Sequence, residues 1–524
     1  MRVTEVEAAD RRRAGLILKI SIFATGCAGI VAEFVLSTLA TYLLGNAVFQ
    51  WTIIMSLMLF AMGLGSRLSK LISKNLLDVF IFVEFSLSIC CAISAVAAFG
   101  LAAWTSQIQV IIYILAMAIG MLIGFEIPLV TRLNENYEEL RVNIANIMEK
   151  DYFGSLVGGF FFAFFALPYL GLTYTPIILG TINFLIACLF VFSFFGLLVR
   201  KKTVLALLAC CTLTLLGTAL LAKPILLYGE QKQYKDKIIY SEQTPYQKII
   251  FTRWKEDIWL FLNGQEQFSS YDEERYHEPL VHPAMLLAGH RSNVLILGGG
   301  DGLALREIWK HQDVKKVTMV DLDPAVTRLA REYKPLVALN QNSMNDQRLK
   351  VVHQDAARFL RETNELFDVI IIDLPDPDSI DLMHLYSRNF YQLVGRHLTT
   401  GGVMVSQATS PWFAKQAFLS IYKTVQAAGF TVLPYHNQIP TMGEWAWVLG
   451  VQAKGMDTNQ LKEKVLKLDF NDLPSRFLDN DAMVSMGHFS RDMVGPQQLE
   501  KVEVNSELSP VLYRYYASGS WDVY

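Results

Sequence analysis

Charged residues are scarce in this chain. Asp, Glu, Lys and Arg make up 18% of its 524 residues, whereas about 25% is usual in soluble proteins. Neither sign of charge dominates, because the formal net charge is −3, which argues against nucleic acid and against a strongly acidic partner. Cysteine is absent from residues 229–524, and all six cysteines lie inside apolar runs, so neither a disulfide framework nor a zinc site is expected. The cysteines are Cys27, Cys90, Cys91, Cys188, Cys210 and Cys211.

Apolar residues, by contrast, form 52% of the chain and are concentrated in nearly continuous runs between residues 14 and 228. A helix that crosses a bilayer needs about 20 predominantly apolar residues. Seven runs qualify, near residues 14–44, 49–66, 77–102, 107–130, 153–171, 174–199 and 203–222. The first run is too long for a cleavable signal peptide. The pattern predicts a multi-pass α-helical domain in the cell membrane, with about seven helices, over residues 1–228.

The distribution of Lys and Arg in the short loops predicts the orientation, because these residues stay on the cytoplasmic side. Arg11, Arg12 and Arg13 precede the first run, and basic residues recur between later pairs of runs. The N-terminus is therefore expected in the cytoplasm. Seven crossings would place the C-terminal half outside, whereas Lys223 and other lysines after the last run favour the inside. Either run 203–222 does not cross, or the C-terminal half faces outward.

Three carboxylates, Glu33, Glu84 and Glu126, fall within the apolar runs. A carboxylate inside a membrane span is costly and often functional. One interpretation is a path or binding site for a polycation, and the other is a carboxylate that is capped or paired within the helix bundle.

From residue 237 the pattern changes to that of a soluble α/β protein. Short alternating strands and the turn Asn263-Gly264 predict a β-meander within residues 229–290. Over residues 291–453, continuously apolar β-branched strands alternate with helices, as expected of a parallel sheet that is buried on both faces. We therefore expect an α/β class-I Rossmann-like domain of the methyltransferase-like type. Residues 454–524 predict an irregular helical extension and are assigned no chemistry.

A glycine-rich turn, Gly298 to Gly302, follows the first of these strands and opens a helix. Glycines let the backbone approach a ligand, and the helix N-terminus favours negative charge. Asp321 ends the next strand about 20 residues later, where a carboxylate suits two ribose hydroxyl groups. A dinucleotide, S-adenosylmethionine and decarboxylated S-adenosylmethionine all fit this pattern.

Asp301, within the turn, discriminates among these ligands. It would repel the carboxylate of a methyl donor but could pair with the ammonium group of the decarboxylated molecule; alternatively, it only caps the next helix. The fourth strand ends in a second acidic segment, which contains Asp373, Asp376 and Asp378. Ligands bind at the carboxyl ends of such strands. We expect these carboxylates to raise one another's pKa and to attract a polyamine.

In order and spacing, these residues resemble the motifs of the spermidine synthases, the polyamine aminopropyltransferases. The matching elements are Tyr246-Gln247, Leu262-Asn263-Gly264 with Gln267, Asp272 to Glu278, His282-Pro283, Gly298 to Gly302, Asp321, Asp355-Ala356 and Asp373 to Pro377. The apolar runs resemble the membrane-attached branch of that family. The resemblance implies transfer of the aminopropyl group of decarboxylated S-adenosylmethionine to putrescine or a related amine, which gives spermidine or an analogue and 5′-methylthioadenosine.

The resemblance also implies a role for each site residue. Asp373 would be the general base, and His277, Asp301 and Asp376 would bind the amine. The residues expected to bind the nucleoside of the donor, and so methylthioadenosine, are Gln247, Gly298, Gly300, Asp321, Asp355 and Ala356. The donor would be a co-substrate rather than a tightly bound cofactor, and no metal-ligand cluster is visible. The implied partners are the amine, membrane lipid and a second copy of the chain in a homodimer or higher oligomer.

The acceptor half departs from the family pattern. Met442 follows Ile439-Pro440-Thr441 where the family often has a tyrosine, and Glu444 is a nearby substitute. Leu374 and Pro375 replace small polar residues. The acceptor could therefore be a diamine other than putrescine, or a longer polyamine.

Two other functions remain open on the sequence. One is a membrane-attached methyltransferase that uses S-adenosylmethionine, against which Asp301 and the segment 276–278 argue. The other is a polyamine-binding transporter or sensor. Asp373 together with Asp376 argues for chemistry, because a binding module needs no base.

Overall fold

The computed structural model describes residues 2–44, 47–102, 104–105, 107–135, 139–453 and 455–521, and for residues 2–14 the backbone only. The side chains of Arg11, Arg12 and Arg13, on which the predicted orientation depends, lie outside this description. The chain divides into two compact units, Met1–Lys235 and Asp236–Tyr524.

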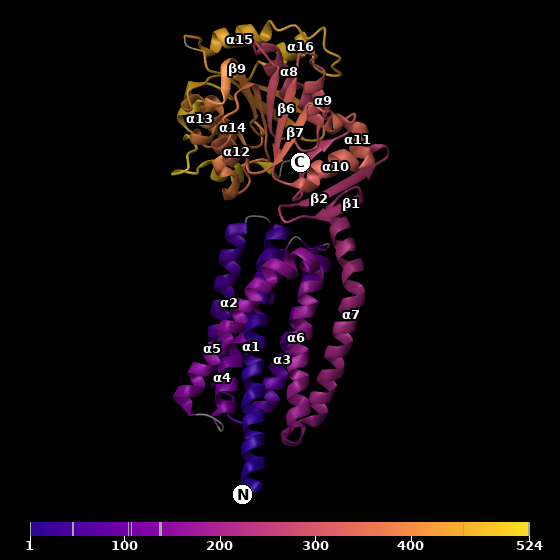
Figure 1. Ribbon diagram of the computed structural model, residues 1–524, viewed down its shortest axis with the longest axis vertical. Coiled ribbons are helices and arrows are strands. Elements are labelled where there is room, and N and C mark those ends of the chain that lie inside the picture. The colour runs from indigo at the N-terminus through magenta and orange to yellow at the C-terminus, as the bar shows by residue number, and fades with distance from the viewer. Residues whose placement is uncertain are drawn as a thin grey trace. The chain divides into compact units, whose positions relative to one another are not determined.

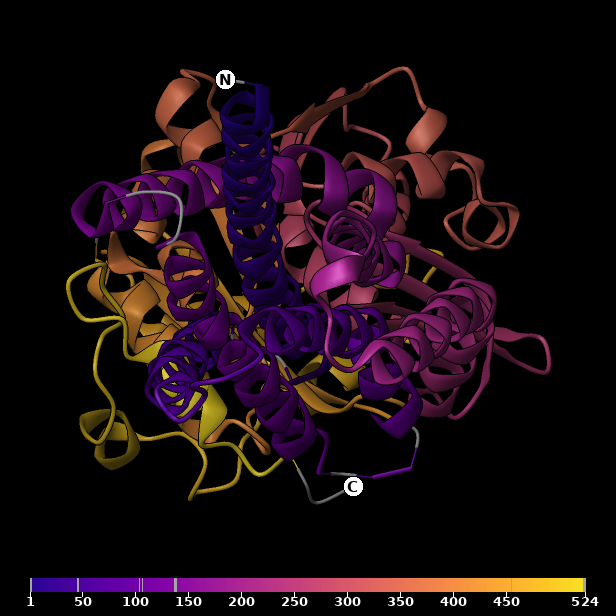
Figure 2. The same cartoon turned by 90° about the horizontal axis from the view of Figure 1, so that it is seen from below.

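The N-terminal unit is built of long helices that pack side by side (Figures 1 and 2). They are α1 (Arg2–Leu44), α2 (Ala47–Ser69), α3 (Leu76–Ala102), α4 (Ile108–Asn134), α5 (Leu140–Phe161), α6 (Gly171–Phe194) and α7 (Lys201–Gln233). A π-helical segment, η1 (Phe162–Leu170), joins α5 to α6, and η2 (Phe195–Leu197) follows α6. Within the described residues, six helical stretches are long and apolar enough to cross a membrane, and one of them, Leu140–Leu197, has 58 residues.

α5 packs along α1 in the same direction. Gly154 lies against the backbone of Phe23, and Gly158, one turn later, lies against Cys27. A Cβ atom added at Gly154 would be 2.0 Å from the carbonyl oxygen of Phe23. These glycines therefore allow the two helices to approach closely, as small residues do between membrane helices.

The 58-residue stretch changes direction between α5 and α6. Phe80, near the start of α3, contacts Phe190, near the end of α6, with ring centroids 4.7 Å apart, so these two helices are antiparallel. Tyr42 and Phe99, near the C-terminal ends of α1 and α3, are 5.4 Å apart, so α3 is parallel to α1 and hence to α5. The chain turns back at Gly171, whose φ of +62° suits glycine. The stretch therefore holds two antiparallel helices.

The C-terminal unit begins with a four-stranded antiparallel sheet in the order β1-β2-β3-β4. Its strands are β1 (Lys237–Gln243), β2 (Lys248–Trp254), β3 (Asp257–Leu262) and β4 (Gln265–Ser269). Asn263 and Gly264, between β3 and β4, have φ angles of 51° and 83°, as a tight hairpin turn requires. The predicted β-meander is confirmed.

A seven-stranded sheet follows, in the order β10-β11-β9-β8-β5-β6-β7. Its strands are β5 (Asn293–Gly298), β6 (Lys316–Asp321), β7 (Leu349–His353), β8 (Phe367–Asp373), β9 (Leu398–Gln407), β10 (Thr431–Ile439) and β11 (Gly443–Val451). The strands from β5 to β9 are parallel, and β11 is antiparallel to both of its neighbours. The mostly parallel sheet confirms the predicted Rossmann-like fold.

Helices cover both faces of this sheet. Along β5, Val294 and Ile296 belong to one buried cluster, and Leu295 and Leu297 belong to another. This two-sided burial is why the strands are continuously apolar. The first face carries α8 (Glu274–Leu287), α9 (Leu303–Trp309), α10 (Pro324–Glu332) and α11 (Lys334–Leu339), and the second carries α12 (Ala356–Glu362), η4 (Ile380–Tyr386), α13 (Arg388–Arg396) and α14 (Lys415–Ala427).

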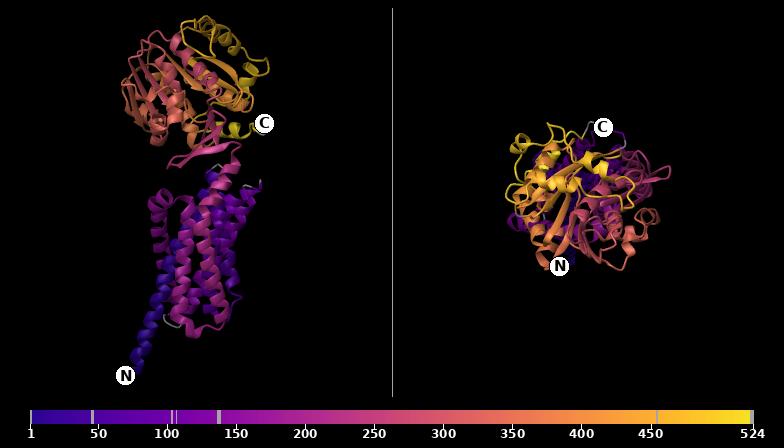
Figure 3. Two further views of the ribbon diagram at one scale, coloured as in Figure 1. Left: turned by 90° about the vertical axis from the view of Figure 1, so that its right-hand side faces the viewer. Right: turned by 90° about the horizontal axis from the view of Figure 1, so that it is seen from above.

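The residues after β11 form a packed helical extension. Its helices are α15 (Thr458–Leu466), α16 (Asn480–Met486), α17 (Pro496–Glu500) and α18 (Leu512–Ala517). Leu461 and Met483 join the buried cluster of the first face, and Leu512 and Tyr516 join that of the second. In Figure 3 this segment, in yellow, runs over the surface of the C-terminal unit. The extension is therefore part of the domain's own core.

Candidate active site

The glycine-rich turn and the acidic segment meet at the carboxyl ends of two neighbouring strands. Gly298, at the end of β5, is paired in register with Asp373, at the end of β8. A Cβ atom at Gly298 would lie 2.0 Å from the carbonyl oxygen of Asp373, and the φ of Gly298 is +87°, so glycine is required there. The N–H of Gly299 donates to the same carbonyl oxygen at 3.2 Å. The sheet thus brings the turn and Asp373 together.

Asp321, at the end of β6, lies on the other side of the turn. Its Oδ2 accepts a hydrogen bond from the N–H of Gly300 at 3.1 Å, and its Oδ1 accepts one from the N–H of Asp323 at 2.9 Å. Burial raises the pKa of Asp321 to about 6, although both backbone hydrogen bonds lower it. The group is therefore an anion at neutral pH and can accept hydrogen bonds from ribose hydroxyl groups.

The loop between β1 and β2 carries Gln247 to the end of β6. Gln247 Nε2 donates to Oδ2 of Asp323 at 3.0 Å, and the hydroxyl group of Thr244 donates to the same oxygen at 2.8 Å. Asp323 also caps α10, because its Oδ1 accepts from the N–H of Ala325. The β-meander thereby adds an amide side chain next to the Asp321 turn.

Asp355 and Ala356 lie where β7 ends and α12 begins. Asp355 caps α12, since its Oδ1 accepts a hydrogen bond from the N–H of Arg358 at 2.8 Å. Its Oδ2 lies 3.1 Å from Nε2 of His384, and this contact holds the pKa of Asp355 below its usual range. The N–H of the preceding residue, Gln354, donates to the carbonyl oxygen of Asp321. The structure therefore places Asp355 beside the end of β6, with Ala356 buried next to it.

Asp373 has the environment of a carboxylate that can act as a base. The hydroxyl group of Tyr276, in α8, donates to its Oδ1 at 2.7 Å. Burial raises the pKa of Asp373 to about 6, His277 lowers it and Asp301 raises it. The sequence analysis expected the aspartates of this segment to raise one another's pKa. The charge of Asp378 does raise the pKa of Asp376, whereas for Asp373 burial comes first and the carboxylate that raises its pKa is Asp301.

His277 belongs to a buried charge network at the start of α8. Its Nδ1 lies 2.8 Å from Oε2 of Glu273, and Nη2 of Arg306 donates to the same oxygen at 3.0 Å. Burial lowers the pKa of His277, but the hydrogen bond and charge of Glu273, together with Asp301 and Asp373, raise it to about 9. His277 is therefore a cation at neutral pH. Its charge favours the ionised form of Asp373.

Asp301 lies in the same region and also caps α9. Its Oδ1 accepts a hydrogen bond from the N–H of Leu303 at 2.8 Å. Burial raises its pKa, whereas the charge of His277 and the Leu303 hydrogen bond lower it. The capping role that the sequence left open is thus present, and the charge of Asp301 reaches both His277 and Asp373.

Asp376, three residues after Asp373, is held by neutral donors. Gln407 Nε2 donates to its Oδ1 at 3.2 Å, and the hydroxyl group of Thr409 donates to its Oδ2 at 3.2 Å. Tyr516 OH, from α18, donates to the same Oδ2 at 2.9 Å. Burial raises the pKa of Asp376 to about 6 and these hydrogen bonds lower it. Asp376 therefore stays an anion at neutral pH.

Several contributors to this site were missed by the sequence analysis. Tyr276, Glu273 and Arg306 have no assigned role there, and Tyr516 lies in the extension to which no chemistry was given. Tyr276 and Glu273 both lie in the matching segment Asp272 to Glu278, with His277, and that position could have revealed them. Met442 is packed against the first-face cluster, and the nearby Glu444 is engaged by His436, whose Nδ1 lies 2.6 Å from Oε1 of Glu444.

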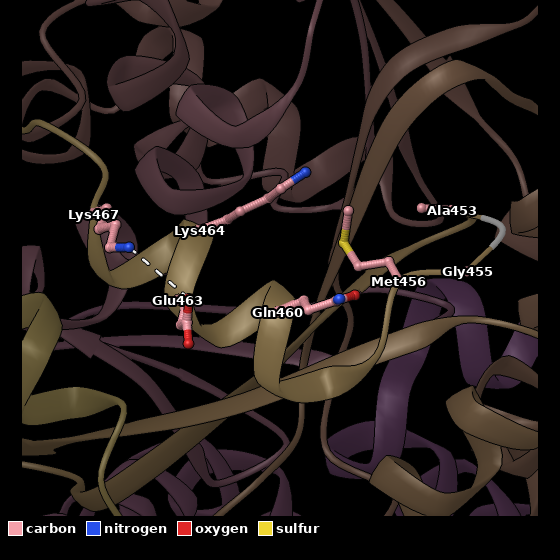
Figure 4. Close-up of a pocket in the computed structure, with 7 residues that line it drawn as sticks. All are labelled: Ala453, Gly455, Met456, Gln460, Glu463, Lys464 and Lys467. Atoms are coloured by element: carbon pink, nitrogen blue, oxygen red, sulfur yellow. Dashed lines mark ion pairs between the residues drawn. The ribbon is translucent and has the colours of Figure 1, made fainter.

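Two other features of the structure include none of these residues. A surface hollow of about 440 Å³ is shown in Figure 4. It is lined by Ala453, Gly455, Met456, Gln460, Glu463, Lys464 and Lys467, none of them an expected site residue. In the N-terminal unit, Glu33, Glu84 and Glu126 are all buried, and neither carboxylate oxygen of Glu84 has a hydrogen-bond partner among the described residues.

The fold and the strand-end carboxylates define the C-terminal unit as a transferase domain of the Rossmann-like class. Residues 273–463 match the family described as the spermine/spermidine synthase domain. The chain is 42% identical over 503 residues to polyamine aminopropyltransferase 2 of Aquifex aeolicus. The aligned residues cover 95% of this chain and 98% of that protein. It therefore belongs to the polyamine aminopropyltransferase family and is an aminopropyltransferase.

A second curated relative agrees with this assignment, and one solved structure matches part of the chain. Polyamine aminopropyltransferase 1 of Streptomyces coelicolor is 41% identical over 448 residues, which are 84% of either protein. Spermidine synthase from Thermotoga maritima, whose crystal structure is known, is 28% identical in sequence to the matched part of this chain. The structural match has a TM-score of 0.44 and covers 50% of this chain and 88% of that one. Membership of this family removes the methyltransferase alternative.

Proposed function

We propose that the chain transfers the aminopropyl group of decarboxylated S-adenosylmethionine to putrescine or a related amine, and that spermidine or its analogue and 5′-methylthioadenosine are the products. The observation that carries this proposal is the environment of Asp373. It lies beside the glycine-rich turn, is held by Tyr276 and has a pKa raised by burial to about 6. A base in this range is ionised at neutral pH and still accepts a proton readily.

The donor half consists of groups around the ends of β5, β6 and β7. Asp321 would bind the ribose hydroxyl groups, with Gln247 beside it, and Asp355 with Ala356 would hold the adenine. Gly298 and Gly300 would let the backbone approach the donor. The donor acts as a co-substrate that leaves as methylthioadenosine.

The reaction is a displacement at carbon. The lone pair of the amine nitrogen forms a bond to the propyl carbon next to the sulfonium, the C–S bond breaks, and its electron pair stays on sulfur as a neutral thioether. An alkyl ammonium group has a pKa of about 10, so the attacking nitrogen must lose one proton to free its lone pair. Asp373 accepts that proton, and the nitrogen keeps its other two protons in the secondary ammonium product. Alignment of the nitrogen with the C–S bond supplies a large part of the rate.

The acceptor half consists of His277, Asp301 and Asp376. Asp301 and Asp376 carry the negative charge that attracts ammonium groups. His277, as a cation, keeps Asp373 ionised and lies along the amine path as a hydrogen-bond donor. In this proposal, Asp301 and Asp376 attract the ammonium groups of the amine, and His277 orients the amine.

We also propose that the N-terminal unit is a multi-pass domain of the cell membrane, that the N-terminus is cytoplasmic, and that the C-terminal half forms a homodimer or higher oligomer. The division into residues 1–228, 229–290, 291–453 and 454–524 belongs to this proposal. If all seven helices, α1 to α7, cross in alternating directions, the two ends of the unit lie on opposite sides and the C-terminal half faces outward. A cysteine in place of exposed Lys255 should then react with a membrane-impermeant thiol reagent on intact cells; protection would show that α7 does not cross.

Product analysis by mass spectrometry tests the reaction. Detergent-solubilised protein is incubated with decarboxylated S-adenosylmethionine and a panel of diamines and polyamines. Methylthioadenosine together with one aminopropylated amine is expected, and it names the acceptor. If folded protein forms no methylthioadenosine with any amine, the proposed reaction is wrong.

A further inference from the structure

The C-terminal extension reaches into the acceptor half of the site. Tyr516, in α18, donates its phenol hydrogen to Oδ2 of Asp376 at 2.9 Å, although 140 positions separate the two residues. Tyr516 lies outside residues 273–463, which match the spermine/spermidine synthase domain. The contact is therefore an addition that the extension makes to the shared domain.

The phenol of Tyr516 is fixed in place. Its side chain is buried, and its ring lies 4.8 Å from that of Trp521. Nε1 of Trp521 donates to the carbonyl oxygen of Tyr516 at 3.1 Å, and the N–H of Ser520 donates to the carbonyl oxygen of Phe413 at 2.8 Å. The end of the chain is thus tied to the loop that follows β9, which also carries Thr409.

A second anchor lies before α18. Asn505 is fully buried, and its Nδ2 donates to the carbonyl oxygens of Met383 and Tyr386 at 3.0 and 3.1 Å. Tyr386 in turn donates to the carbonyl oxygen of Pro375, in the acidic segment itself. The extension therefore holds both Asp376 and the backbone around it.

Asp376 has no cationic partner of its own. The side chains that donate to its carboxylate are neutral, namely Gln407, Thr409 and Tyr516, and no Lys, Arg or His in the described part of the chain lies within ion-pair distance. As a whole residue, Asp376 remains partly exposed. An anion held by neutral donors, with one part open, is suited to an ammonium group that arrives with a substrate.

We propose that Tyr516 is a positioning residue of the acceptor site: its hydroxyl group holds the Asp376 carboxylate in the orientation that binds the ammonium group of a linear diamine at the end that is not attacked. The inference rests on the proposed function and deepens it. It makes the C-terminal extension a determinant of acceptor binding. Within the described residues, the Tyr516 hydroxyl group contacts Asp376 and none of the residues assigned to the donor half.

Tyr516→Phe removes only the hydroxyl group and tests the assignment. We expect the KM for the amine to rise about tenfold, since a hydrogen bond to a charged group is lost. The donor KM, the affinity for methylthioadenosine and the melting temperature should stay near those of the unaltered protein. Tyr515→Phe, on the same helix, is the matched control and should leave both KM values unchanged.

The pH profile separates positioning from a merely structural role. The charged or titratable groups that face Asp376 are Tyr516, Tyr386, Tyr276 and Asp378. Loss of the Tyr516 hydrogen bond raises the pKa of Asp376, so the acid limb of kcat/KM for the amine should move to higher pH. The effect of Tyr516→Phe should also largely vanish in an Asp376→Asn background, because the two residues act as one unit.

The outcomes are distinguishable. Turnover by the unaltered protein, with an unchanged amine KM and pH profile in Tyr516→Phe, would overturn this inference and leave the proposed function intact. Additive effects of Tyr516→Phe and Asp376→Asn would overturn it as well. Absence of methylthioadenosine with the unaltered protein would instead overturn the proposed function, and the inference with it.

Discussion

The hydroxyl group of Tyr276 donates a hydrogen bond to Oδ1 of Asp373 at 2.7 Å, across 97 positions of sequence. The ring of Tyr276 is buried between helix and sheet, with Trp445 and Trp447 at centroid distances of 6.4 and 5.6 Å. A rigid aromatic side chain thus fixes one oxygen of Asp373. In the proposed reaction, the other oxygen would accept the proton.

Removal of this hydroxyl group should change the pH dependence of the reaction. The hydrogen bond lowers the pKa of Asp373, which burial has raised to about 6, so Tyr276→Phe should raise that pKa further. The acid limb of kcat/KM then moves to higher pH. We expect kcat near neutral pH to fall about tenfold. Tyr435→Phe, a buried tyrosine that donates to the carbonyl oxygen of Pro279, is the control and should leave the limb in place.

Replacement of the base itself should separate binding from turnover. In Asp373→Asn the side chain keeps its shape but cannot accept a proton, so kcat should fall about 10²- to 10⁴-fold. The dissociation constant of methylthioadenosine, measured by calorimetry, should change little. Retention of turnover within a factor of about three would contradict the assignment of Asp373 as general base.

Asp321 should affect the donor alone. Asp321→Asn loses the anion that accepts hydrogen bonds from the ribose, so the donor KM and the methylthioadenosine dissociation constant should rise about tenfold or more. The amine KM should stay the same. Asp346→Asn, in the loop before β7, where Asp346 pairs with Arg348 at 2.7 Å, is a surface control. An increase in the amine KM alone would reverse the assignment.

The His277–Glu273 pair should make stability depend on pH on the alkaline side. The pKa of His277 is raised from 6.5 to about 9, so the folded protein binds this proton more tightly than the unfolded chain. The stabilisation is full below pH 6.5 and is lost as the pH rises through about 9. Melting temperatures of the unaltered protein and of His277→Gln should therefore converge between pH 7 and 9.5. A gap that widens with pH would show that the sign is wrong.

Close packing in the N-terminal unit can be tested with a pair of glycines. Leucine at Gly154 would collide with the backbone of Phe23, whereas nothing lies within 4 Å of a Cβ atom at Gly217 in α7. Gly154→Leu should lower the yield of folded protein in detergent, and Gly217→Leu should not. Equal yields would mean that α1 and α5 do not pack as closely as described.

Features with a local signal could be predicted from the sequence. The β-meander follows from alternation and from the turn at Asn263-Gly264, and the parallel sheet follows from strands such as β5, whose residues are buried on both faces. Most helices of the N-terminal unit are longer than the corresponding apolar runs, although α6 ends at Phe194, before the end of run 174–199. α5 begins at Leu140, well before residue 153, because its first turns are polar but still helical. Hydropathy marks the apolar part of a helix and carries no information about its polar ends.

In the candidate site, too, the sequence predicts the positions of some residues but not those of their partners. Asp321 and Asp373 end strands, so their positions at one edge of the sheet follow from the fold. The partners of such residues do not, because Arg306 reaches Glu273 over 33 positions and Tyr516 reaches Asp376 over 140. No periodicity or motif encodes those distances. The cause of the raised pKa of Asp373, which is burial first, is likewise a property of the packed domain.

The tie between the chain end and Asp376 has a thermodynamic consequence. If the amine binds a carboxylate that α18 helps to hold, then docking of α18 and occupancy by the amine share a coupling free energy, and each must favour the other to the same extent. Saturation with the amine should slow hydrogen exchange at the backbone amides of Leu512–Ala517.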